Sequence, residues 1–286
     1  MGRIFVAGAA GNIGSALVDA LEDKAGVVAG VHSPDKASGL AAKGVEARVC
    51  DFADKDSMTA AMAGCDRLFL VLPFAEKLAR YGRNAVDAAG EAGIEYIVRS
   101  SGYGASSDAH WRLGREHGMA DQFVEDSGIP FTVLRPNSFM QNFTGHLASM
   151  VRAGAISLPE EDYAVSYIDA RDIAACAARL LLDGQGHEGN FYALTGPEKL
   201  TLHQVAETIA SAAGIEVAYV PVEEEAYIEA LDASGVPEWN RNMLVSLSRV
   251  VKLGMLGNVT QAVEYLTGTR ARAFEAFAAE NAGAWK

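Results

Sequence analysis

The sequence has few cysteines and no cysteine motif. Cys50, Cys65 and Cys176 are the three cysteines among 286 residues, and they are widely spaced with no CxxC pair. An odd number of separated cysteines provides no disulfide framework. We therefore expect three buried, inert thiols and a reducing, cytoplasmic environment.

Basic residues are also scarce, because 24 Lys and Arg face 37 Asp and Glu, a formal net charge of −13. Such a surface repels the phosphates of nucleic acids and anionic lipids, so neither is an expected partner. No apolar run approaches the roughly twenty residues of a membrane span, and the first residues lead into an expected strand rather than a signal peptide. The histidines form no HExxH motif, so no metal site is predicted. A small molecule is the expected partner of a monomer or homodimer.

Short apolar segments alternate with helical segments through the first half of the chain. The expected strands are 4–7, 27–31, 45–50, 68–72, 96–99 and 131–134, and the expected helices are 12–23, 35–43, 54–63, 76–92 and 109–127. This alternation is typical of a parallel sheet that helices cover on both faces. We predict an α/β fold, a doubly wound parallel Rossmann sheet of order 3-2-1-4-5-6 with a small, mostly helical C-terminal lobe.

The alternation ends at Pro136. Residues 164–168 and 191–194 resemble strands on either side of a helix at 170–182. Thr201 and Gln204 form a capping box for a helix that ends at Gly214. We assign 1–136 to a dinucleotide-binding domain, to which 164–195 returns, and 137–163 with 196–286 to a small substrate-side lobe.

A glycine motif follows the first expected strand and opens the first helix, Gly8-Ala9-Ala10-Gly11-Asn12-Ile13-Gly14. The first glycine permits a tight turn, the second lets the backbone approach a pyrophosphate, and the third lets the helix pack closely on the strand. The helix N-terminus adds free N–H groups for the phosphates. The motif predicts an NAD(P) site with contacts from Gly8, Gly11, Asn12, Ile13 and Gly14.

The tip of the second expected strand carries no acidic residue, although NAD sites usually place Asp or Glu there. The residues that follow Val31 at this tip, His32, Ser33 and Lys36 among them, suit a ribose 2′-phosphate, which favours NADP (NADPH) over NAD. An ordinary solvated loop is the alternative interpretation. Residues just past later strands are further candidate cofactor contacts: Asp51, Phe52, Leu72, Pro73, Phe74, Ser100 and Asn137.

Several segments together resemble the NmrA-like branch of the atypical short-chain dehydrogenases/reductases. They are the glycine motif, Val31–Lys36, Cys50–Phe52, Ser127–Pro136, Phe139–Asn142 and Tyr265–Gly268. The layout, over residues 1–282, is similar to the type 2 NAD(P)H:quinone reductases and the triphenylmethane-dye reductases. The resemblance implies NAD(P)H binding, a Rossmann domain with a small lobe, and reduction of a quinone-like, azo or triarylmethane acceptor. Two departures are His32, where the branch often has Arg, and the missing Tyr-x-x-x-Lys pair, since Ser107 stands four residues after Tyr103.

A proton donor for the acceptor is expected on the helix after the fifth strand. His117 stands four residues before Asp121, so both side chains share one helix face, where Asp121 would orient the imidazole and raise its pKa. In the related phenylpropanoid reductases a catalytic lysine aligns with His117. The alternative is a structural His–Asp pair, and Tyr103 and His110 are weaker candidates. The catalytic prediction is therefore His117, Asp121 and Tyr103.

A flat aromatic acceptor needs apolar walls on which its rings can stack. The candidate substrate residues are Phe74, Tyr103, Trp111, Phe139, Gln141 and Phe143. These walls favour a reductase over the alternative function, a non-catalytic NAD(P)-binding redox sensor that acts through a protein partner. An epimerase with tightly held NAD is disfavoured by the missing Tyr-x-x-x-Lys pair.

Overall fold

The computed structural model describes residues 2–42 and 44–286. Their contacts divide the chain into two compact units, Met1–Pro136 with Ala170–Ala193, and Asn137–Asp169 with Leu194–Lys286. The assignment of one part to the cofactor and the other to the substrate stays a prediction.

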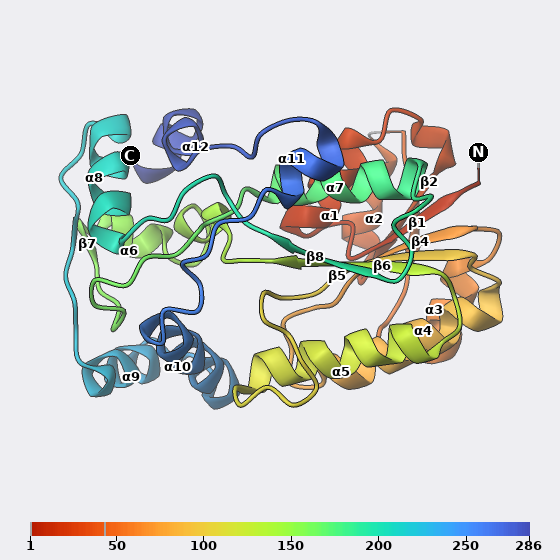
Figure 1. Ribbon diagram of the computed structural model, residues 1–286, viewed down its shortest axis with the longest axis horizontal. Helices are drawn as coiled ribbons and strands as arrows, with labels where there is room; N and C mark the ends of the chain where they lie inside the picture. Colours follow the sequence, from red (N-terminus) through yellow and green to blue (C-terminus); the bar gives the residue numbers. More distant parts are fainter. Residues whose placement is uncertain (1, 43) are drawn as a thin grey trace. The chain divides into compact units, whose positions relative to one another are not determined.

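A seven-stranded sheet organises the first unit (Figure 1). Its order is β3-β2-β1-β4-β5-β6-β8, which confirms the predicted order of the first six strands and adds a seventh. The strands are β1 Ile4–Ala7, β2 Val27–Val31, β3 Glu46–Val49, β4 Arg67–Val71, β5 Tyr96–Ser100, β6 Phe131–Pro136 and β8 Asn190–Leu194. The first six pair in parallel. The strand β8 runs the same way as β6, since Gly189 N–H donates to Phe131 O and Asn137 N–H donates to Leu194 O.

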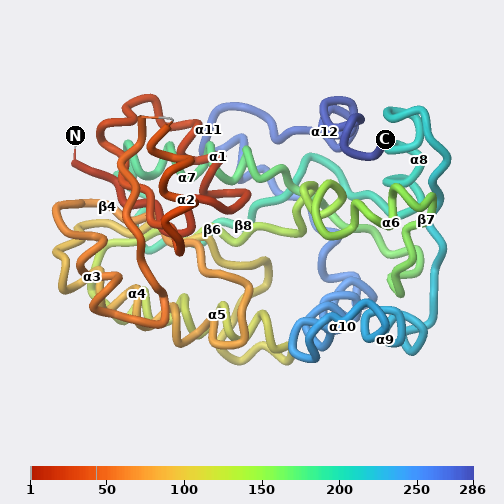
Figure 2. The backbone as a smooth tube through the Cα atoms, turned by 180° about the vertical axis from the view of Figure 1, so that it is seen from behind, coloured from red at the N-terminus to blue at the C-terminus, as the bar shows by residue number. Residues whose placement is uncertain are grey.

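Helices cover both faces of this sheet, which explains why its strands are continuously apolar. The helices are α1 Asn12–Ala20, η1 Lys24–Gly26, α2 Pro34–Ala41, α3 Lys55–Met62, α4 Leu78–Ala92, α5 Arg112–Asp126 and α7 Ala170–Leu182. The helix α1 packs against α7, α3 packs against α4, and α4 packs against α5. Figures 1 and 2 show α1 and α7 on one face and α3, α4 and α5 on the other. The fold class is confirmed.

The loop that leaves β5 is pressed against α5 through a glycine. A Cβ on Gly118 would come 2.0 Å from the carbonyl carbon of Ser106 and 2.3 Å from the nitrogen of Ser107. Helix α4 packs just as closely on another side of α5, since a Cβ on Gly82 of α4 would come 2.8 Å from the Cβ of Ala120. The helix α5 is therefore fixed by backbone-close contacts on two sides.

The second unit is mostly helical around an aromatic core. Its elements are η2 Met140–Phe143, α6 Ala148–Arg152, β7 Ala155–Ile156, α8 Leu202–Ala213, β9 Ala218–Tyr219, α9 Glu224–Ala233, α10 Glu238–Lys252, α11 Ala262–Thr267, α12 Phe274–Asn281 and η3 Ala282–Trp285. The Phe143 ring centroid lies 5.3 Å from that of Tyr167 and 5.4 Å from that of Phe274. The indole N–H of Trp285 donates to the Phe143 carbonyl at 2.7 Å. The capping box at Thr201 is present as predicted.

The strand predicted at 164–168 is wrong. This segment makes two isolated bridges, Val165 with Leu200 and Ile168 with Phe139. Its N–H groups donate to three separate segments, from Val165 to Leu200, from Ser166 to Leu256 and from Ile168 to Ser138. The backbone N–H groups of this apolar segment are therefore hydrogen-bonded to several segments and not to one partner strand, so no β-strand forms.

Within the described residues, no helix combines the length and apolarity that crossing a membrane requires.

The contact at Gly118 generates a stability test. Gly118→Ala should destabilise the protein by roughly 2 kcal/mol or more, because the added methyl meets backbone atoms that have little room to move. Gly90→Ala is the matched control, since Gly90 is exposed in α4 and a Cβ there would meet no atom within 4 Å. The control should gain up to about 1 kcal/mol from helix propensity. Urea unfolding followed by circular dichroism measures both, and equal stability of the two variants would contradict the packing described.

Candidate functional site

The glycine motif forms the turn between β1 and α1. Gly8 has φ +74°, a left-handed conformation that favours glycine, and a Cβ there would come 2.8 Å from Val71 Cγ1. A Cβ on Gly14 would come 2.3 Å from the Gly8 carbonyl oxygen. A Cβ on Gly11 would meet that oxygen at 3.4 Å, an ordinary contact, at φ −83°. The fold itself thus requires glycine at 8 and 14, whereas its packing tolerates a side chain at Gly11.

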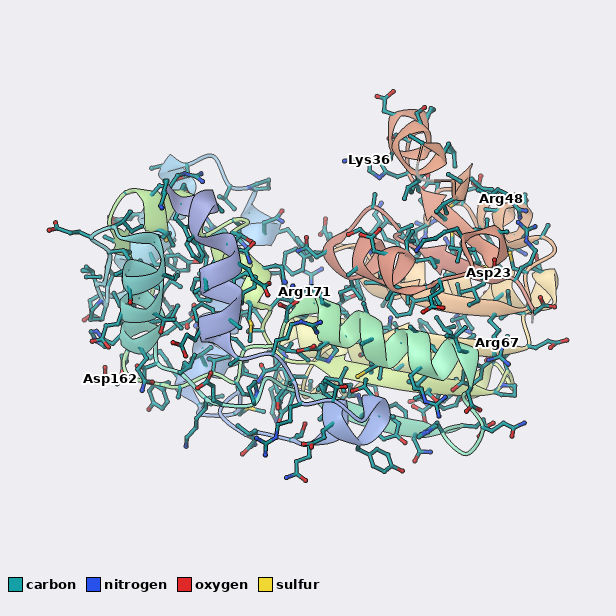
Figure 3. All side chains as sticks on the ribbon, turned by 90° about the horizontal axis from the view of Figure 1, so that it is seen from above. Asp23, Lys36, Arg48, Arg67, Asp162 and Arg171 are labelled. Carbon is teal, nitrogen blue, oxygen red and sulfur yellow. The ribbon has the colours of Figure 1, made fainter. Side chains whose placement is uncertain are left out.

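The tip of β2 leads directly into α2. His32 and Lys36 are exposed there, and Figure 3 shows Lys36 projecting outward from α2. Ser33 is the N-cap of α2 and makes no side-chain capping bond, while Pro34 occupies the first turn. The predicted ribose-phosphate residues are therefore accessible.

The other predicted cofactor residues of the first unit follow the carboxyl ends of neighbouring parallel strands. After β3, the Asp51 carboxylate accepts from the Ala53 N–H at 2.8 Å, and the Phe52 ring centroid lies 6.5 Å from that of Tyr81. After β4, Leu72 is buried while Pro73 is exposed, as is Phe74 at 45%. Ser100 is buried at the end of β5. The fold gathers these residues along the sheet edge where α/β proteins bind ligands.

The predicted pairing of His117 with Asp121 is wrong in detail, because a guanidinium lies between them. Arg99 Nε donates to Asp121 Oδ1 at 2.7 Å, and Arg99 Nη2 lies 3.2 Å from His117 Nδ1. Asp121 Oδ2 accepts from the Ser101 hydroxyl at 2.9 Å and from Arg135 Nη2 at 3.0 Å. His117 and Asp121 share one face of α5, as their spacing predicts, but Arg99 of the adjacent strand binds both side chains.

The expected direction of the His117 pKa is also wrong. Burial and the positive charge of Arg99 lower the pKa of His117 from 6.5 to about 3. The imidazole is therefore neutral at physiological pH and is not an ionised acid. Arg99 is fully buried on β5 and Asp121 is 1% exposed. Sequence reasoning missed Arg99, although a charged residue inside an apolar strand is the signal that marks it.

The predicted acceptor residues divide between the two units. Tyr103, Trp111 and Phe74 belong to the first unit. The Trp111 ring contacts the loop after β5 and the first turn of α5, since Cβ atoms on Gly104 and Gly114 would lie 3.3 Å and 2.3 Å from it. Phe139, Gln141 and Phe143 belong to the second unit, and Phe143 is a core residue at 1% exposure. The pocket that these residues would line stays a prediction.

The predicted cofactor residue Asn137 and the predicted acceptor residue Gln141 both have hydrogen-bond partners within the second unit. The Asn137 amide nitrogen donates to Ser166 Oγ at 2.8 Å and to the Leu256 carbonyl at 2.9 Å. Gln141 donates to Asp169 Oδ1 at 2.9 Å. Both hydrogens of the Asn137 amide are thus engaged, and its contact with a cofactor stays a prediction.

A carboxyl group that sequence reasoning missed lies in the second unit. Burial raises the pKa of Glu160 to about 7, while a hydrogen bond from Ser248 opposes the shift. The next residue, Glu161, has φ +50° and forms an ion pair with Lys252 at 2.7 Å. The left-handed conformation of Glu161 is sparsely populated for residues other than glycine. At this bend of the chain the Glu160 carboxyl group is buried, while the Glu161 carboxylate is exposed and paired with Lys252.

The three cysteines are free and buried, as expected. Burial raises the pKa of Cys50 to about 11 and that of Cys176 to about 12, so both thiols are protonated at neutral pH. In the described part of the chain, no three His, Cys, Asp or Glu side chains are grouped as a metal site requires.

A parallel sheet with a glycine turn between its first strand and first helix defines the class of Rossmann dinucleotide-binding proteins. The chain belongs to the NmrA-like family, whose model matches residues 1–272.

Two curated relatives extend this comparison. The chain is 34% identical to an NAD(P)H azoreductase of Xenophilus azovorans over 283 residues, 99% of each chain. It is 29% identical to quinone oxidoreductase 2 of Escherichia coli over 269 residues, 93% of each.

Two solved structures of reductases are similar to this chain over nearly its whole length. The NADPH complex of the Escherichia coli quinone oxidoreductase superposes with a TM-score of 0.87 at 27% identity, covering 97% of this chain and 99% of the other. The triphenylmethane reductase of Citrobacter sp. superposes with a TM-score of 0.85 at 25% identity, covering 98% and 99%.

Glu160 generates a pH prediction. Its pKa is raised in the folded protein, so its contribution to stability is present below pH 4.5 and is lost as the pH rises towards about 7. Glu160→Gln removes this titration, and relative to the wild type it should gain on the order of 1–3 kcal/mol between pH 4.5 and 7. Urea unfolding at several pH values measures the difference. Glu161→Gln is the control for an exposed neighbouring carboxylate, and a wild-type pH profile in Glu160→Gln would refute the assignment.

Proposed function

We propose that this protein is an NAD(P)H-dependent reductase that transfers hydride to a quinone-like or other conjugated aromatic acceptor, azo and triarylmethane compounds included. The favoured cofactor is NADPH. The observation that carries the proposal is the glycine turn at the carboxyl end of β1, where Gly8 and Gly14 are required by packing and Gly11 is not. A glycine that the fold does not need is explained by a pyrophosphate that approaches the backbone.

The relatives support the reaction type. An NAD(P)H azoreductase and a quinone oxidoreductase share more than nine-tenths of their length with this chain. A structural relative carries NADPH, which agrees with exposed His32 and Lys36 and half-buried Ser33 beside the predicted ribose position and with the missing acid there.

The bound nicotinamide supplies the hydride, and the chain supplies orientation and surroundings. The α1 N-terminus and the Gly11 backbone would hold the pyrophosphate. The residues after β4, with exposed Phe74 among them, would flank the nicotinamide and give a flat acceptor an aromatic surface. His117 on α5 offers a polar contact to the acceptor.

The activity is tested by following oxidation of NADPH and NADH against a panel of quinones, azo dyes and triarylmethane dyes. We expect turnover with at least one acceptor class and faster oxidation of NADPH than of NADH. Direct binding of both cofactors is measured in parallel. Tight cofactor binding without turnover across the panel would overturn the proposal and favour a redox sensor that acts through a protein partner.

Gly11→Val separates the ligand from the fold. The variant should stay folded, because a Cβ at Gly11 makes only an ordinary contact with Gly8 O, although replacing the N-cap glycine of α1 by valine should cost about 1 kcal/mol of stability. Its affinity for NADPH should fall by about 100-fold or more, because the side chain occupies the space of the pyrophosphate. Calorimetric titration measures the affinity, and Gly11→Ala should give a smaller loss. Unchanged affinity in Gly11→Val would refute the site.

A further inference from the structure

The strongest feature outside the cofactor turn is the buried guanidinium of Arg99. All three of its nitrogens donate: Nε to Asp121 Oδ1 at 2.7 Å, Nη1 to the Ser100 carbonyl at 3.4 Å, and Nη2 to the His117 carbonyl at 3.3 Å. The side chain has no exposed surface. It is therefore held in one orientation by groups on β5 and α5.

This orientation places a donor against the imidazole of His117. Arg99 Nη2 lies 3.2 Å from Nδ1 of the ring. A guanidinium has only donors and is not deprotonated in proteins, so Nδ1 must accept. An imidazole that accepts at Nδ1 and is neutral carries its proton on Nε2.

The other edge of the ring faces the chain that leaves β5. A Cβ on Gly102 would come 3.4 Å from His117 Cδ2 and 3.8 Å from Nε2. Within residues 2–42 and 44–286, Nε2 has no hydrogen-bond partner, and the side chain is only partly buried. The proton on Nε2 is thus directed to the carboxyl edge of the sheet, next to the strand ends that carry the predicted cofactor residues.

We propose that Arg99 is a positioning residue that fixes His117 as the neutral tautomer with its proton on Nε2, so that His117 gives the acceptor a hydrogen bond instead of a proton. The inference rests on the proposed reductase function. The hydrogen bond stabilises the negative charge that arrives on the acceptor oxygen or nitrogen with the hydride. Water then supplies the proton, because a neutral imidazole that lost the Nε2 proton would become an anion.

The charged groups around His117 determine its titration. Arg99 of β5 contacts the imidazole directly. Asp121 of α5 binds Arg99, and Arg135 of β6 in turn binds Asp121, so neither of these two charges contacts the ring. Glu116, the preceding residue, accepts from the Ala79 N–H at the start of α4 at 3.0 Å. The nearest charge is therefore positive, and turnover should not depend on ionisation of His117 between pH 5 and 8.

The first test reads the tautomer in the wild-type protein. With ¹⁵N-labelled histidine, long-range ¹H–¹⁵N correlation spectra should show His117 with an unprotonated Nδ1 and a protonated Nε2, unchanged from pH 5 to 8. His117→Gln identifies the resonances by their loss. A protonated Nδ1, or both nitrogens protonated at pH 7, would overturn the proposal whether or not an acceptor is turned over.

The second test uses variants. Arg99→Met removes the positive charge that contacts His117 and should raise the pKa of His117, while burial, the larger cause of the lowered pKa, continues to oppose ionisation. In this variant kcat should become several-fold higher as the pH falls towards 5, whereas the wild-type profile stays flat. Arg99→Lys keeps the positive charge and should keep the flat profile of the wild type. Arg135→Met is the matched control, because it removes the other guanidinium bound to Asp121 without contacting His117. Cofactor affinity should be unchanged in Arg99→Met and in the control.

A donor role for Nε2 has its own readout. His117→Gln retains an N–H at a similar distance from the main chain and should keep more of the wild-type kcat than His117→Leu, with similar cofactor affinity in both. Equal kcat in His117→Leu and the wild type would refute the role of His117 while leaving the reductase function standing. Absence of turnover in every form, with the tautomer as expected, would refute the reductase instead.

Discussion

A fully buried guanidinium needs a carboxylate, and in this protein that requirement ties the centre of the sheet to its covering helix. Arg99 on β5 and Asp121 on α5 are both buried, and Ser101 and Arg135 complete the carboxylate's hydrogen bonds. Removing one partner of such a pair costs about 3–5 kcal/mol, since the other charge stays buried. The pair therefore constrains β5, α5 and β6 together, and with them the loop that carries Tyr103 and the ring of His117.

Glycine provides the complementary constraint, because it lets main chains approach where no side chain fits. Gly118 brings α5 against the loop after β5, and Gly14 brings α1 against the turn after β1. Gly11 differs from both, since its Cβ direction is compatible with the packing of the protein. Within one motif, therefore, packing requires glycine at two positions and leaves the third free for the ligand contact that we propose.

The proposed chemistry follows from how the protein controls charge near the acceptor. A neutral His117 beside a permanent positive charge gives a polar contact whose state does not change over the physiological pH range. Hydride transfer to a conjugated acceptor adds negative charge, which a fixed donor stabilises without reorganisation. In the second unit, burial raises the pKa of Glu160 to about 7, so this carboxyl group does change its charge in that range.

The sequence by itself determined six of the seven strands of the main sheet and the glycine turn, because hydrophobic periodicity and backbone requirements are local properties. Their order followed from the alternation of strands and helices, which is typical of a doubly wound sheet. The resemblance in the Ser127–Pro136 and Phe139–Asn142 segments indicated the family that the comparison confirmed. Only the tertiary structure decided that Arg99 stands between His117 and Asp121, that 164–168 threads among three segments, and that Phe143 belongs to a core. All three features are contacts between segments that are distant in the sequence. Residue spacing and composition describe only neighbouring residues, so they do not determine such contacts.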